Sequence, residues 1–550
     1  MTEEKALEFQ ANMNFNSRRS AVISLKGMVA TSQPLAVSAG LKILDKGGNA
    51  ADAAIATAAA LNVTEPTSTG IGGDCFALYY DAKTKMISAL NGSGKSPMAL
   101  TLDRVKEDGF TEKMPLFHPH TITVPGAAAG WCDLIEKHGK LTMQEILAPA
   151  IDLAERGFPV APITAYFWER AVDRQLSKAP NGLEMTIDGR APKPGEIFKN
   201  HGLAKTFRKL AEGGKEEFYK GEIAESIVKV IQDAGGVMSE EDLANHSSRW
   251  EEPISTSYHG FRVWECPPNG QGLAALLALN LLEGYDLAEF GPLSAERLHL
   301  QIEAMRLAFA DTAYFVADPE LNPTPLMELL SKSYSDERRK LINPKKAVLD
   351  QVKGSPTTSS DTVYLTVVDA DGNACSFIIS NYMGFGTGFV PKGFGFTLQN
   401  RGNGFLLKEG HPNSLAPGKR PYHTIIPSMI THADNGDLFS SYGVMGGFMQ
   451  PQGHMLMSVN LIIDQLDPQS ALDRPRFSIN DGMAGGMVAL ENGISIDVMS
   501  KLAMMGHKVS PVSGHARATF GRGQIILRDR KTGVLWGGSD PRADGLAMSQ

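Results

Sequence analysis

The sequence has few cysteines, no strongly basic region and no long uninterrupted apolar segment. Its four cysteines lie far apart and form no Cys-x-x-Cys pair. We therefore expect neither a disulfide framework nor a zinc site, and we expect reduced thiols, as in a cytosolic protein. The formal charge of −8 and the lack of a basic cluster argue against nucleic acid or an anionic membrane as the main partner.

Segments that would direct the chain to a membrane are also missing. Met1 to Arg19 is polar and mixed in charge, without the apolar core of a signal peptide. The most apolar long run, Ala50 to Val63, is rich in alanine, contains Asp52 and is too short to span a bilayer. We therefore expect a soluble, cytoplasmic protein that binds no membrane.

Several widespread catalytic motifs are absent. The sequence has no P-loop, no His-Glu-x-x-His zinc motif and no Gly-x-Ser-x-Gly nucleophile elbow. Gly384 to Gly388 is rich in glycine but lies between expected strands, so we interpret it as turns. His118-Pro119-His120 has a spacing seen in metal sites, but no third ligand is nearby in sequence, and we interpret it as an ordinary loop. Nothing in the sequence requires a metal or an organic cofactor.

The most informative stretch begins at Thr362, where a polar segment changes into a β-branched one. The pattern predicts a strand from Thr362 onward, the turn Asp369-Ala370-Asp371-Gly372-Asn373 and a second strand, Ala374 to Ile379, which together form a buried hairpin. Lys353 to Ser360, just before it, is polar and typical of an exposed, mobile loop.

Cleavage between Asp361 and Thr362 would give Thr362 a free α-amine beside its own hydroxyl. With a reference pKa of about 7.7–8.0, that amine can act as the base for the hydroxyl, and no histidine is needed. From the local pattern alone, a buried strand threonine is the commoner interpretation.

A second candidate is the glycine pair Gly446-Gly447. Adjacent glycine amides can both point into a site and stabilise a developing oxyanion, where the loss of one donor costs about 2.7–4 kcal/mol. A tight turn explains the pair equally well, and the local sequence leaves both interpretations open.

The expected secondary structure changes along the chain. Residues 1 to about 27 are expected to form a loosely held lead-in. Small side chains from Ala50 to Asn62, after the cap Asn49, predict a helix that packs closely on all sides. The stretch from 120 to 345 is mostly helical by pattern, with its clearest helix from Ser294 to Val316, whereas strands and glycine-rich loops dominate from 362 to about 450.

Several short motifs occur in order along nearly the whole chain, from Met28 to Asp544. They are Gly47-Gly48-Asn49-Ala50-Ala51-Asp52-Ala53, Glu65-Pro66 with Gly70-Ile71-Gly72-Gly73, Pro125-Gly126, Ala308-Phe309-Ala310-Asp311, Asp361-Thr362 with Val368-Asp369-Ala370-Asp371-Gly372-Asn373-Ala374, Gly386-Thr387-Gly388 and Ser539-Asp540-Pro541-Arg542. Together they resemble the γ-glutamyltransferase (glutathione hydrolase) family of N-terminal-nucleophile hydrolases. The chain looks like the soluble branch that includes glutathione-hydrolase-like proteins and oxamate amidohydrolase.

The resemblance implies an α+β fold, the αββα four-layer sandwich of N-terminal-nucleophile hydrolases, made as one inactive chain that cuts itself. It implies a mostly helical large subunit 1–361 and a small subunit 362–550, which carries the nucleophile, joined in one compact domain. The products would form a heterodimer, and a higher oligomer is also open. Thr362 matches the nucleophile, and Gly446 and Gly447 match the oxyanion pair. Ser380 and Asn381 fall near the family's residues around the nucleophile's amine and the substrate.

The expected substrate pocket departs from the family pattern. Asn91 stands where typical members have the arginine that binds the glutamate α-carboxylate, and Gly404 stands where an acid binds the α-amine. Arg401 offers a replacement cation, although a solvated arginine at a loop end is the alternative interpretation. His423 and Thr424 replace a pair of serines.

The resemblance leaves three hypotheses of function open. The first is a hydrolase, or acyltransferase, of γ-glutamyl amides such as glutathione. The second is a small-amide amidohydrolase of the oxamate type, whose substrate carboxylate binds to Arg401 through charge-assisted hydrogen bonds. The third is a non-catalytic binding member of the family.

Overall fold

A computed structural model of the protein describes residues 19–349, 362–483 and 485–550. Its centre is two seven-stranded sheets, in which all neighbouring strands are antiparallel. Sheet I has the order β1 (Val22–Ser24), β18 (Leu535–Ser539), β17 (Arg522–Arg528), β13 (Leu438–Met445), β12 (Ser428–His432), β9 (Phe261–Glu265) and β8 (Ile254–Tyr258). Sheet II has the order β19 (Leu546–Ser549), β2 (Met28–Thr31), β10 (Val363–Val368), β11 (Ala374–Ser380), β3 (Asp74–Asp81), β4 (Met86–Gly92) and β7 (Arg249–Glu251).

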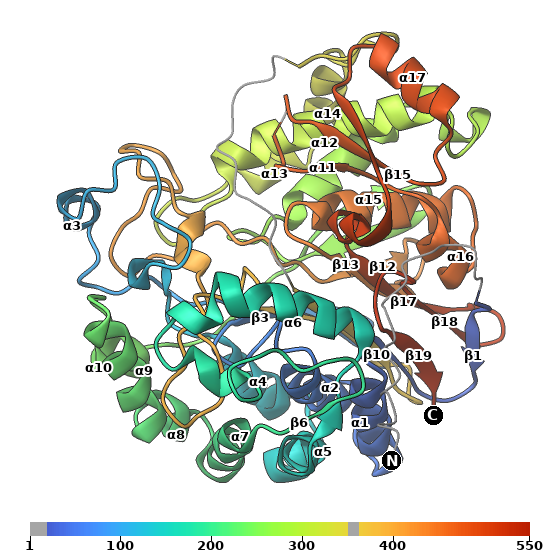
Figure 1. Ribbon diagram of the computed structural model, residues 1–550. Helices are drawn as coiled ribbons and strands as arrows, with labels where there is room; N and C mark the ends of the chain where they lie inside the picture. The colour runs from blue at the N-terminus through green and yellow to red at the C-terminus, as the bar shows by residue number, and fades with distance from the viewer. Residues whose placement is uncertain (1–18, 350–361, 484) are drawn as a thin grey trace, which may run out of the picture.

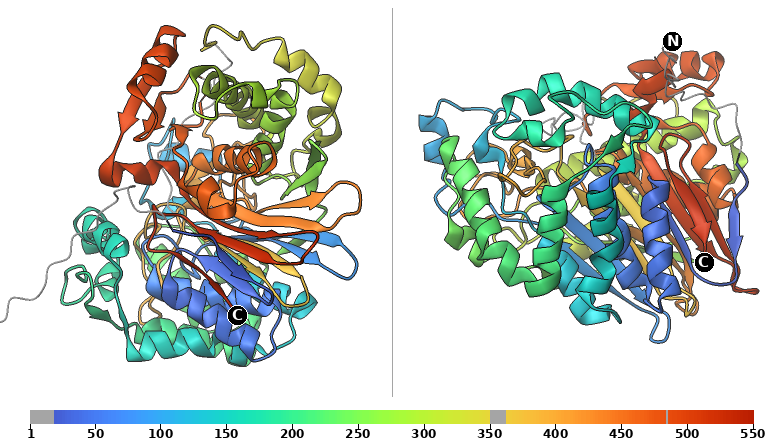
Figure 2. Two further views of the ribbon diagram at one scale, coloured as in Figure 1. Left: turned by 90° about the vertical axis from the view of Figure 1, so that its right-hand side faces the viewer. Right: turned by 60° about the horizontal axis from the view of Figure 1, so that its bottom comes forward.

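The two sheets stack face to face, and helices cover the outer face of each (Figures 1 and 2). Phe76 and Tyr364 of sheet II meet Met429 and Ile526 of sheet I in the core between the sheets. Two further cores lie between each sheet and its helices. The protein therefore has the α+β, αββα sandwich that the motifs imply.

The helical layers come from different parts of the chain. The helices beside sheet II are α1 (Pro34–Asp45), α2 (Ala50–Thr64), α4 (Ala127–His138), α5 (Met143–Arg156), α6 (Pro162–Arg174), α7 (His201–Gly213), α8 (Lys215–Tyr219) and α9 (Glu222–Asp233). Those beside sheet I are α11 (Gly272–Leu282), α12 (Ala295–Phe315), α14 (Lys332–Arg339), α15 (Met449–Ile462) and α16 (Pro468–Asp473). Smaller elements are α3 (Leu102–Glu107), α10 (Glu240–Ala244), α13 (Leu326–Leu329), α17 (Ile496–Met504), the pair β5 (Phe158–Pro159) and β6 (Ile197–Phe198), and a third sheet of β14 (Phe477–Ile479), β15 (Val488–Glu491) and β16 (Val509–Val512).

Helix α2 shows how local sequence and packing agree. Asn49 accepts hydrogen bonds from the first amides of the helix, and Asp52 accepts one from the Asn49 amide, which completes a capping box. Every residue of α2 is buried. Gly40 of α1 lies so close that a Cβ there would be 2.3 Å from the Thr57 hydroxyl. Small side chains on both helices therefore permit this close approach, and the predicted helix is confirmed.

Most other predicted elements are confirmed, with one exception. The helix predicted from Ser294 to Val316 is α12, capped by the Ser294 side chain, and the hairpin is β10 and β11. The prediction of a loosely held lead-in up to about residue 27 was wrong in part, because Val22–Ser24 forms an edge strand that pairs with β18. A three-residue strand whose partner lies over 500 residues away leaves no local signal. Residues 1–18 and the predicted loop Lys353 to Ser360 lie outside the described residues.

Segments on either side of residue 362 contribute strands to both sheets. In sheet II, β10 and β11 lie between β2 and β3, and in sheet I, β12 and β13 lie between β9 and β17. The ladder hydrogen bonds thus join 1–361 to 362–550 in both layers. A cut before Thr362 would leave the two products held together by the same sheets.

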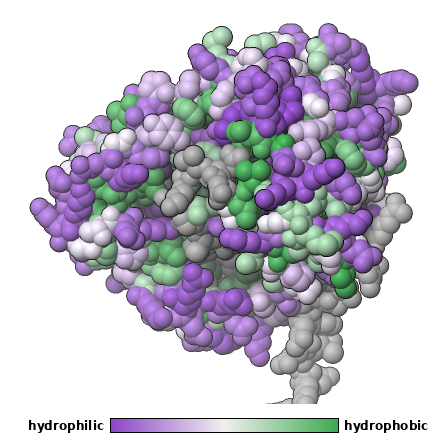
Figure 3. Space-filling view, turned by 90° about the horizontal axis from the view of Figure 1, so that it is seen from above, coloured by the Kyte–Doolittle hydropathy of each residue, from purple (hydrophilic) through white to green (hydrophobic). Residues whose placement is uncertain are grey.

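The surface seen from above in Figure 3 is mostly hydrophilic, with a hydrophobic strip near its middle. Within the described ranges, none of the helices combines the length and the apolar character needed to cross a membrane. The cytoplasmic location stays a prediction.

Candidate active site

Thr362 immediately precedes β10, and its side chain is fully buried. Because Val363 pairs with Ile379, Thr362 lies beside Ser380 of β11, and its Oγ1 donates a hydrogen bond to Ser380 Oγ at 3.1 Å. Asp361, the other half of the predicted cleavage bond, lies outside the described residues. The predicted nucleophile therefore has a defined hydroxyl partner at the start of a central strand.

Strands β10 and β13 face each other at regular steps across the core between the sheets. The hydroxyls of Thr366 on β10 and Ser441 on β13 form a 2.6 Å hydrogen bond. At the next pair, Gly443 lies against the ring of Tyr364, and a Cβ on this glycine would be only 2.5 Å from the ring. Side chains on one face recur every second residue, so a further step reaches the nucleophile on β10 and the end of β13. The facing pairs are Thr366 with Ser441, Tyr364 with Gly443 and, by that step, Thr362 with Met445.

The predicted oxyanion pair lies directly after Met445. Gly446 and Gly447 have φ angles of 129° and 58°, which other residues rarely adopt. Their carbonyls accept hydrogen bonds, one from the Met449 amide and one from Gln271 Nε2 at 2.8 Å. Neither glycine amide donates to another group in the described part of the chain. Two available donors directly after the strand that faces β10 suit an oxyanion site, and this role stays a prediction.

A fully buried arginine, Arg401, lies behind the nucleophile's partner. Nη1 donates to Thr424 Oγ1 at 2.7 Å and Nη2 to Ser380 Oγ at 3.5 Å, while the guanidinium lies 4.5 Å from the centre of the Tyr382 ring. Its Nε has no hydrogen-bond partner, and none of the ion pairs among the described residues includes Arg401. Burial lowers the pKa of Arg401 to about 10, and the charge of Asp74 opposes this only in part. The interpretation of Arg401 as a solvated arginine was wrong: it is a buried cation without a counter-ion.

His423 and Asp74 form a second buried pair, 349 residues apart in sequence. His423 Nδ1 lies 3.4 Å from the Ile425 amide, which can only donate, so Nε2 carries the proton and donates to Asp74 Oδ2 at 2.9 Å. Burial lowers the pKa of His423 to about 4, and Arg401 adds to the effect. The ring is therefore neutral near pH 7. Asp74 also accepts from two glycine amides and a glutamine side chain, which ties three loops together.

Asn91 lies in sheet II, but its side-chain amide already has partners. Nδ2 donates to Asn269 Oδ1 at 2.9 Å and lies 3.3 Å from Glu251 Oε2, while Oδ1 accepts from the Ser93 hydroxyl at 2.6 Å. The side chain is fully buried and lines neither cavity described below. Its role as a substrate ligand stays a prediction, and the structure gives it a competing structural role.

Asn381 is held by the glycine-rich loop before β3. Its Nδ2 donates to Thr397 Oγ1 at 2.9 Å. A Cβ on Gly70 would lie 2.9 Å from that nitrogen, and a Cβ on Gly73 would lie 2.4 Å from Oδ1. The motif glycines thus allow the loop to pack directly on this side chain, next to Ser380.

Two cavities reach the region, and Phe448 lines both. The larger, about 320 Å³, includes Gly446 and the arginines Arg170 and Arg522 in its wall. The smaller, about 100 Å³, is lined by Thr424, Tyr382, Gly404 and the carboxylates Asp481 and Glu112, among others. Gly404 therefore lies on the wall of a pocket, as the expected substrate pocket implied. The carboxylates on the same wall, Asp481 and Glu112, come from other segments of the chain.

Gln271 is a positioning residue that the motifs did not indicate. Its Nε2 donates to the carbonyls of Thr424, at 2.6 Å, and Gly447, at 2.8 Å, and its Oε1 accepts from the Tyr422 hydroxyl at 3.1 Å. It thereby joins the arginine side of the site to the oxyanion side. Gln271, Asp481 and Phe448 belong to segments that meet only in the folded chain, so no local spacing marks them.

The sequence and fold match known proteins over almost their full length. The family model for gamma-glutamyltranspeptidase matches residues 36–550. The chain is 36% identical to the glutathione hydrolase-like YwrD proenzyme of Bacillus subtilis (strain 168), over 96% of this chain and 99% of that protein. It is 31% identical to the oxamate amidohydrolase proenzyme of Klebsiella pneumoniae, over 96% and 99%. The crystal structure of a cephalosporin acylase from Bacillus halodurans is 45% identical, covers 100% of this chain and 99% of its own, and superposes with a TM-score of 0.91.

Proposed function

The chain belongs to the gamma-glutamyltranspeptidase family, and on that basis we propose that it is a self-processed amide hydrolase with Thr362 as its N-terminal nucleophile. Its acyl substrate carries a carboxylate that binds to Arg401, and γ-glutamyl amides such as glutathione are the first substrate class. Water is the acceptor in hydrolysis, and an amine replaces it in transfer. The observation that carries the proposal is the buried, unpaired guanidinium of Arg401 beside Ser380 and Thr362.

An unpaired buried cation is costly, and a bound anion removes much of that cost. The contacts from Arg401 to Ser380, 3.5 Å, and from Ser380 to Thr362, 3.1 Å, keep the guanidinium within two hydrogen-bond lengths of the nucleophilic oxygen. An acyl group whose carbonyl lies at Thr362 can therefore reach Arg401 with a carboxylate. Charge-assisted hydrogen bonds of this kind are about twice as strong as neutral ones.

In the proposed reaction, the α-amine of Thr362 takes the hydroxyl proton as Oγ1 attacks the amide carbonyl. The carbonyl electron pair moves to its oxygen, where the amides of Gly446 and Gly447 stabilise the negative charge. The carbon–nitrogen bond then breaks, and the α-ammonium returns its proton to the leaving amine. Water attacks the resulting ester by the same route, which releases the acid and restores the hydroxyl.

The same hydroxyl supports the processing step. Attack of Thr362 Oγ1 on the carbonyl carbon of Asp361 transfers the acyl group from nitrogen to oxygen, and hydrolysis of that ester separates the products 1–361 and 362–550. Relatives named as proenzymes support a precursor of this kind.

The substrate class is tested by incubating purified, processed protein with glutathione and measuring released glutamate. Wild type should release glutamate, and Arg401→Leu should release it far more slowly while remaining processed. No glutamate from processed wild type would contradict the γ-glutamyl class and leave the hydrolase class to be tested on other amides.

Gly404 favours a second candidate, a small amide without an α-amine, because the acid expected at this position is missing. Asp481, on the wall of the same cavity, is the carboxylate that would bind an α-amine if one is present. Ammonia release from oxamate, without glutamate release from glutathione, would decide for the small amide. Asp481→Asn should slow glutathione hydrolysis and leave oxamate hydrolysis unchanged.

A further inference from the structure

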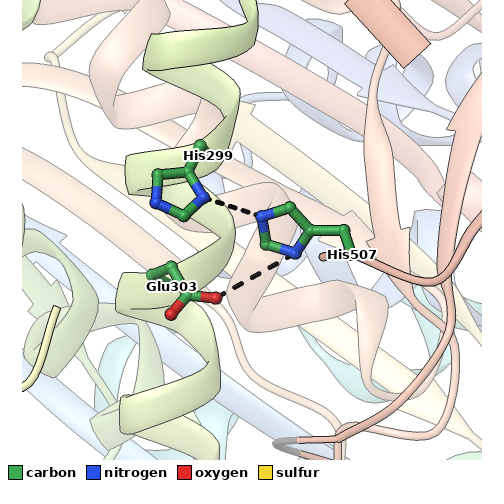
Figure 4. A group of neighbouring side chains, drawn as sticks. All are labelled: His299, Glu303 and His507. Carbon is green, nitrogen blue, oxygen red and sulfur yellow. Dashed lines mark hydrogen bonds and ion pairs between the residues drawn. The ribbon is translucent and has the colours of Figure 1, made fainter. Parts of the chain in front are cut away.

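Three buried side chains outside the candidate active site meet between helix α12 and the segment before β16: His299, Glu303 and His507 (Figure 4). His299 and Glu303 are four residues apart on α12, so they lie on the same face of the helix. Each of the three can offer one ligand atom, and these atoms all lie within 4.8 Å of one another.

Hydrogen bonding determines which atoms face the centre of the cluster. His299 Nε2 lies 2.7 Å from the carbonyl oxygen of Asn343, which can only accept, so Nε2 carries the proton and Nδ1 has a free lone pair. His299 Nδ1 in turn lies 2.7 Å from His507 Nε2. If a proton joins these two nitrogens, it belongs to His507, and His507 Nδ1 is then left as an acceptor.

That arrangement leaves two buried acceptors facing each other. His507 Nδ1 and Glu303 Oε1 are 4.0 Å apart, and neither has a hydrogen-bond partner. A separation of 4.0 Å is too long for a hydrogen bond, and these atoms would have to approach to about 3.4 Å, the spacing that bonds of about 2.0–2.2 Å give around a tetrahedral ion. Arg306 Nε lies 3.6 Å from Glu303 Oε1, an ion pair without a hydrogen bond.

Backbone groups also hold the outer atoms of two of these side chains. His299 donates through Nε2 to Asn343, and Glu303 Oε2 accepts from the Val348 amide at 2.9 Å. Metal-binding histidines and carboxylates are oriented in this way, with the second atom bonded to a neighbouring group.

We propose that His299, Glu303 and His507 bind one divalent transition-metal ion of the zinc class, through a ring nitrogen of each histidine and Oε1 of Glu303. Two neutral imidazoles and one carboxylate favour zinc and related ions over magnesium or calcium. The two nitrogens now 2.7 Å apart must separate to about 3.3 Å, the spacing that bonds of about 2.0–2.1 Å require around a tetrahedral ion.

The ion would join parts of the fold that the proposed processing separates. His299 and Glu303 belong to 1–361, and His507 belongs to 362–550. The same contacts hold the backbone from Asn343 to Val348, shortly before the predicted cleavage bond. The ion would therefore add a link between the two products; this role rests on the proposed processing, whereas binding of the ion does not.

The test measures metal content in the full chain, purified without a metal column, by elemental mass spectrometry. About one zinc-class ion per chain is expected, and Glu303→Gln, which keeps the shape of the side chain, should reduce that content at least tenfold. His118→Asn, at a half-buried histidine of the His118-Pro119-His120 motif, is the matched control and should retain the ion. Replacement by Co²⁺ should give the visible absorption of a nitrogen- and oxygen-bound ion in wild type and not in Glu303→Gln.

A second measurement covers the case in which the ion is lost during purification. Adding Zn²⁺ to chelator-treated wild type should raise the Tm by several degrees, and the rise should be absent in Glu303→Gln and present in His118→Asn. Wild type with neither bound metal nor a Tm response would overturn the proposal and identify the cluster as hydrogen-bonded side chains alone. Because neither measurement uses substrate or Thr362, a failure here is distinct from a failure of the proposed function.

Discussion

Two buried arginines, Arg542 and Arg401, have opposite electrostatic surroundings. Arg542 donates to both oxygens of Glu491, at 2.8 and 2.6 Å, and to Asp540 at 3.0 Å. Burial alone would lower the pKa of Arg542, but the charges of Asp540 and Glu491 raise this pKa above its ordinary value. Arg401 has hydroxyl partners in place of carboxylates, and burial lowers its pKa to about 10.

Under the proposed function, the contrast separates a structural cation from a substrate-binding one. Asp540 also accepts from Arg476, and Glu491 from Arg517, so every arginine of the cluster around the Ser539-Asp540-Pro541-Arg542 motif has a carboxylate partner within the protein. Arg401 has only hydroxyl partners among the described residues, and it lies beside the predicted nucleophile. A charged motif is thus a stability element where its partners are internal, and a binding element where the partner has to come from outside.

The largest effect is expected on the stability of the paired cluster. Arg542→Leu should lower the free energy of unfolding by about 3–5 kcal/mol, because Glu491 and Asp540 would remain buried with too few partners. Urea unfolding measures this, and activity per folded molecule should be unchanged. A loss below about 1 kcal/mol would remove the distinction between the two regions.

Arg401→Leu should show the opposite pattern. Its free energy of unfolding should stay within about 1 kcal/mol of wild type, since no carboxylate loses a partner. Its kcat/KM for glutathione should fall about 100-fold, which corresponds to about 2.7 kcal/mol, through loss of the charge-assisted contact. A substrate analogue whose carboxylate is converted to a primary amide is the control. If Arg401→Leu lowers kcat/KM equally for glutathione and for the amide analogue, Arg401 does not bind the carboxylate.

A third effect concerns the acid side of the pH profile. The pKa of His423 falls from 6.5 to about 4 on folding, so between these values the unfolded chain binds a proton that the folded chain does not. Stability should therefore decrease as the pH falls from 6.5 to 4. Because Arg401 contributes to the lowered pKa, Arg401→Leu should weaken this dependence, and His423→Asn should remove its share. NMR titration of labelled histidines measures the pKa directly, and an unchanged value in Arg401→Leu would contradict the coupling.

The sequence predicts this molecule well where the signal is local. The β10–β11 hairpin, the all-buried helix α2 and the capped helix α12 follow from residue pattern and are present. The motifs also indicated the sandwich. They assigned Ser380 and Arg401 to the same site as Thr362, and in the structure Ser380 contacts both residues.

What the sequence could not show depends on contacts between distant segments. The burial of Arg401, the bond from His423 to Asp74 and the bridge through Gln271 arise only when segments that are separated in the sequence meet in the folded chain. Asn91 illustrates this limit of sequence-based prediction. Its position in the sequence showed a departure from the family pattern, but it did not show the hydrogen bonds that the side-chain amide forms.

The most direct test of the account is the intact mass and N-terminal sequence of the purified protein, measured for wild type and Thr362→Ala. The account predicts two products from wild type, with the second beginning at Thr362, and one uncut chain from Thr362→Ala. An uncut wild-type chain that still hydrolyses amides, or a cut at another bond, would contradict it.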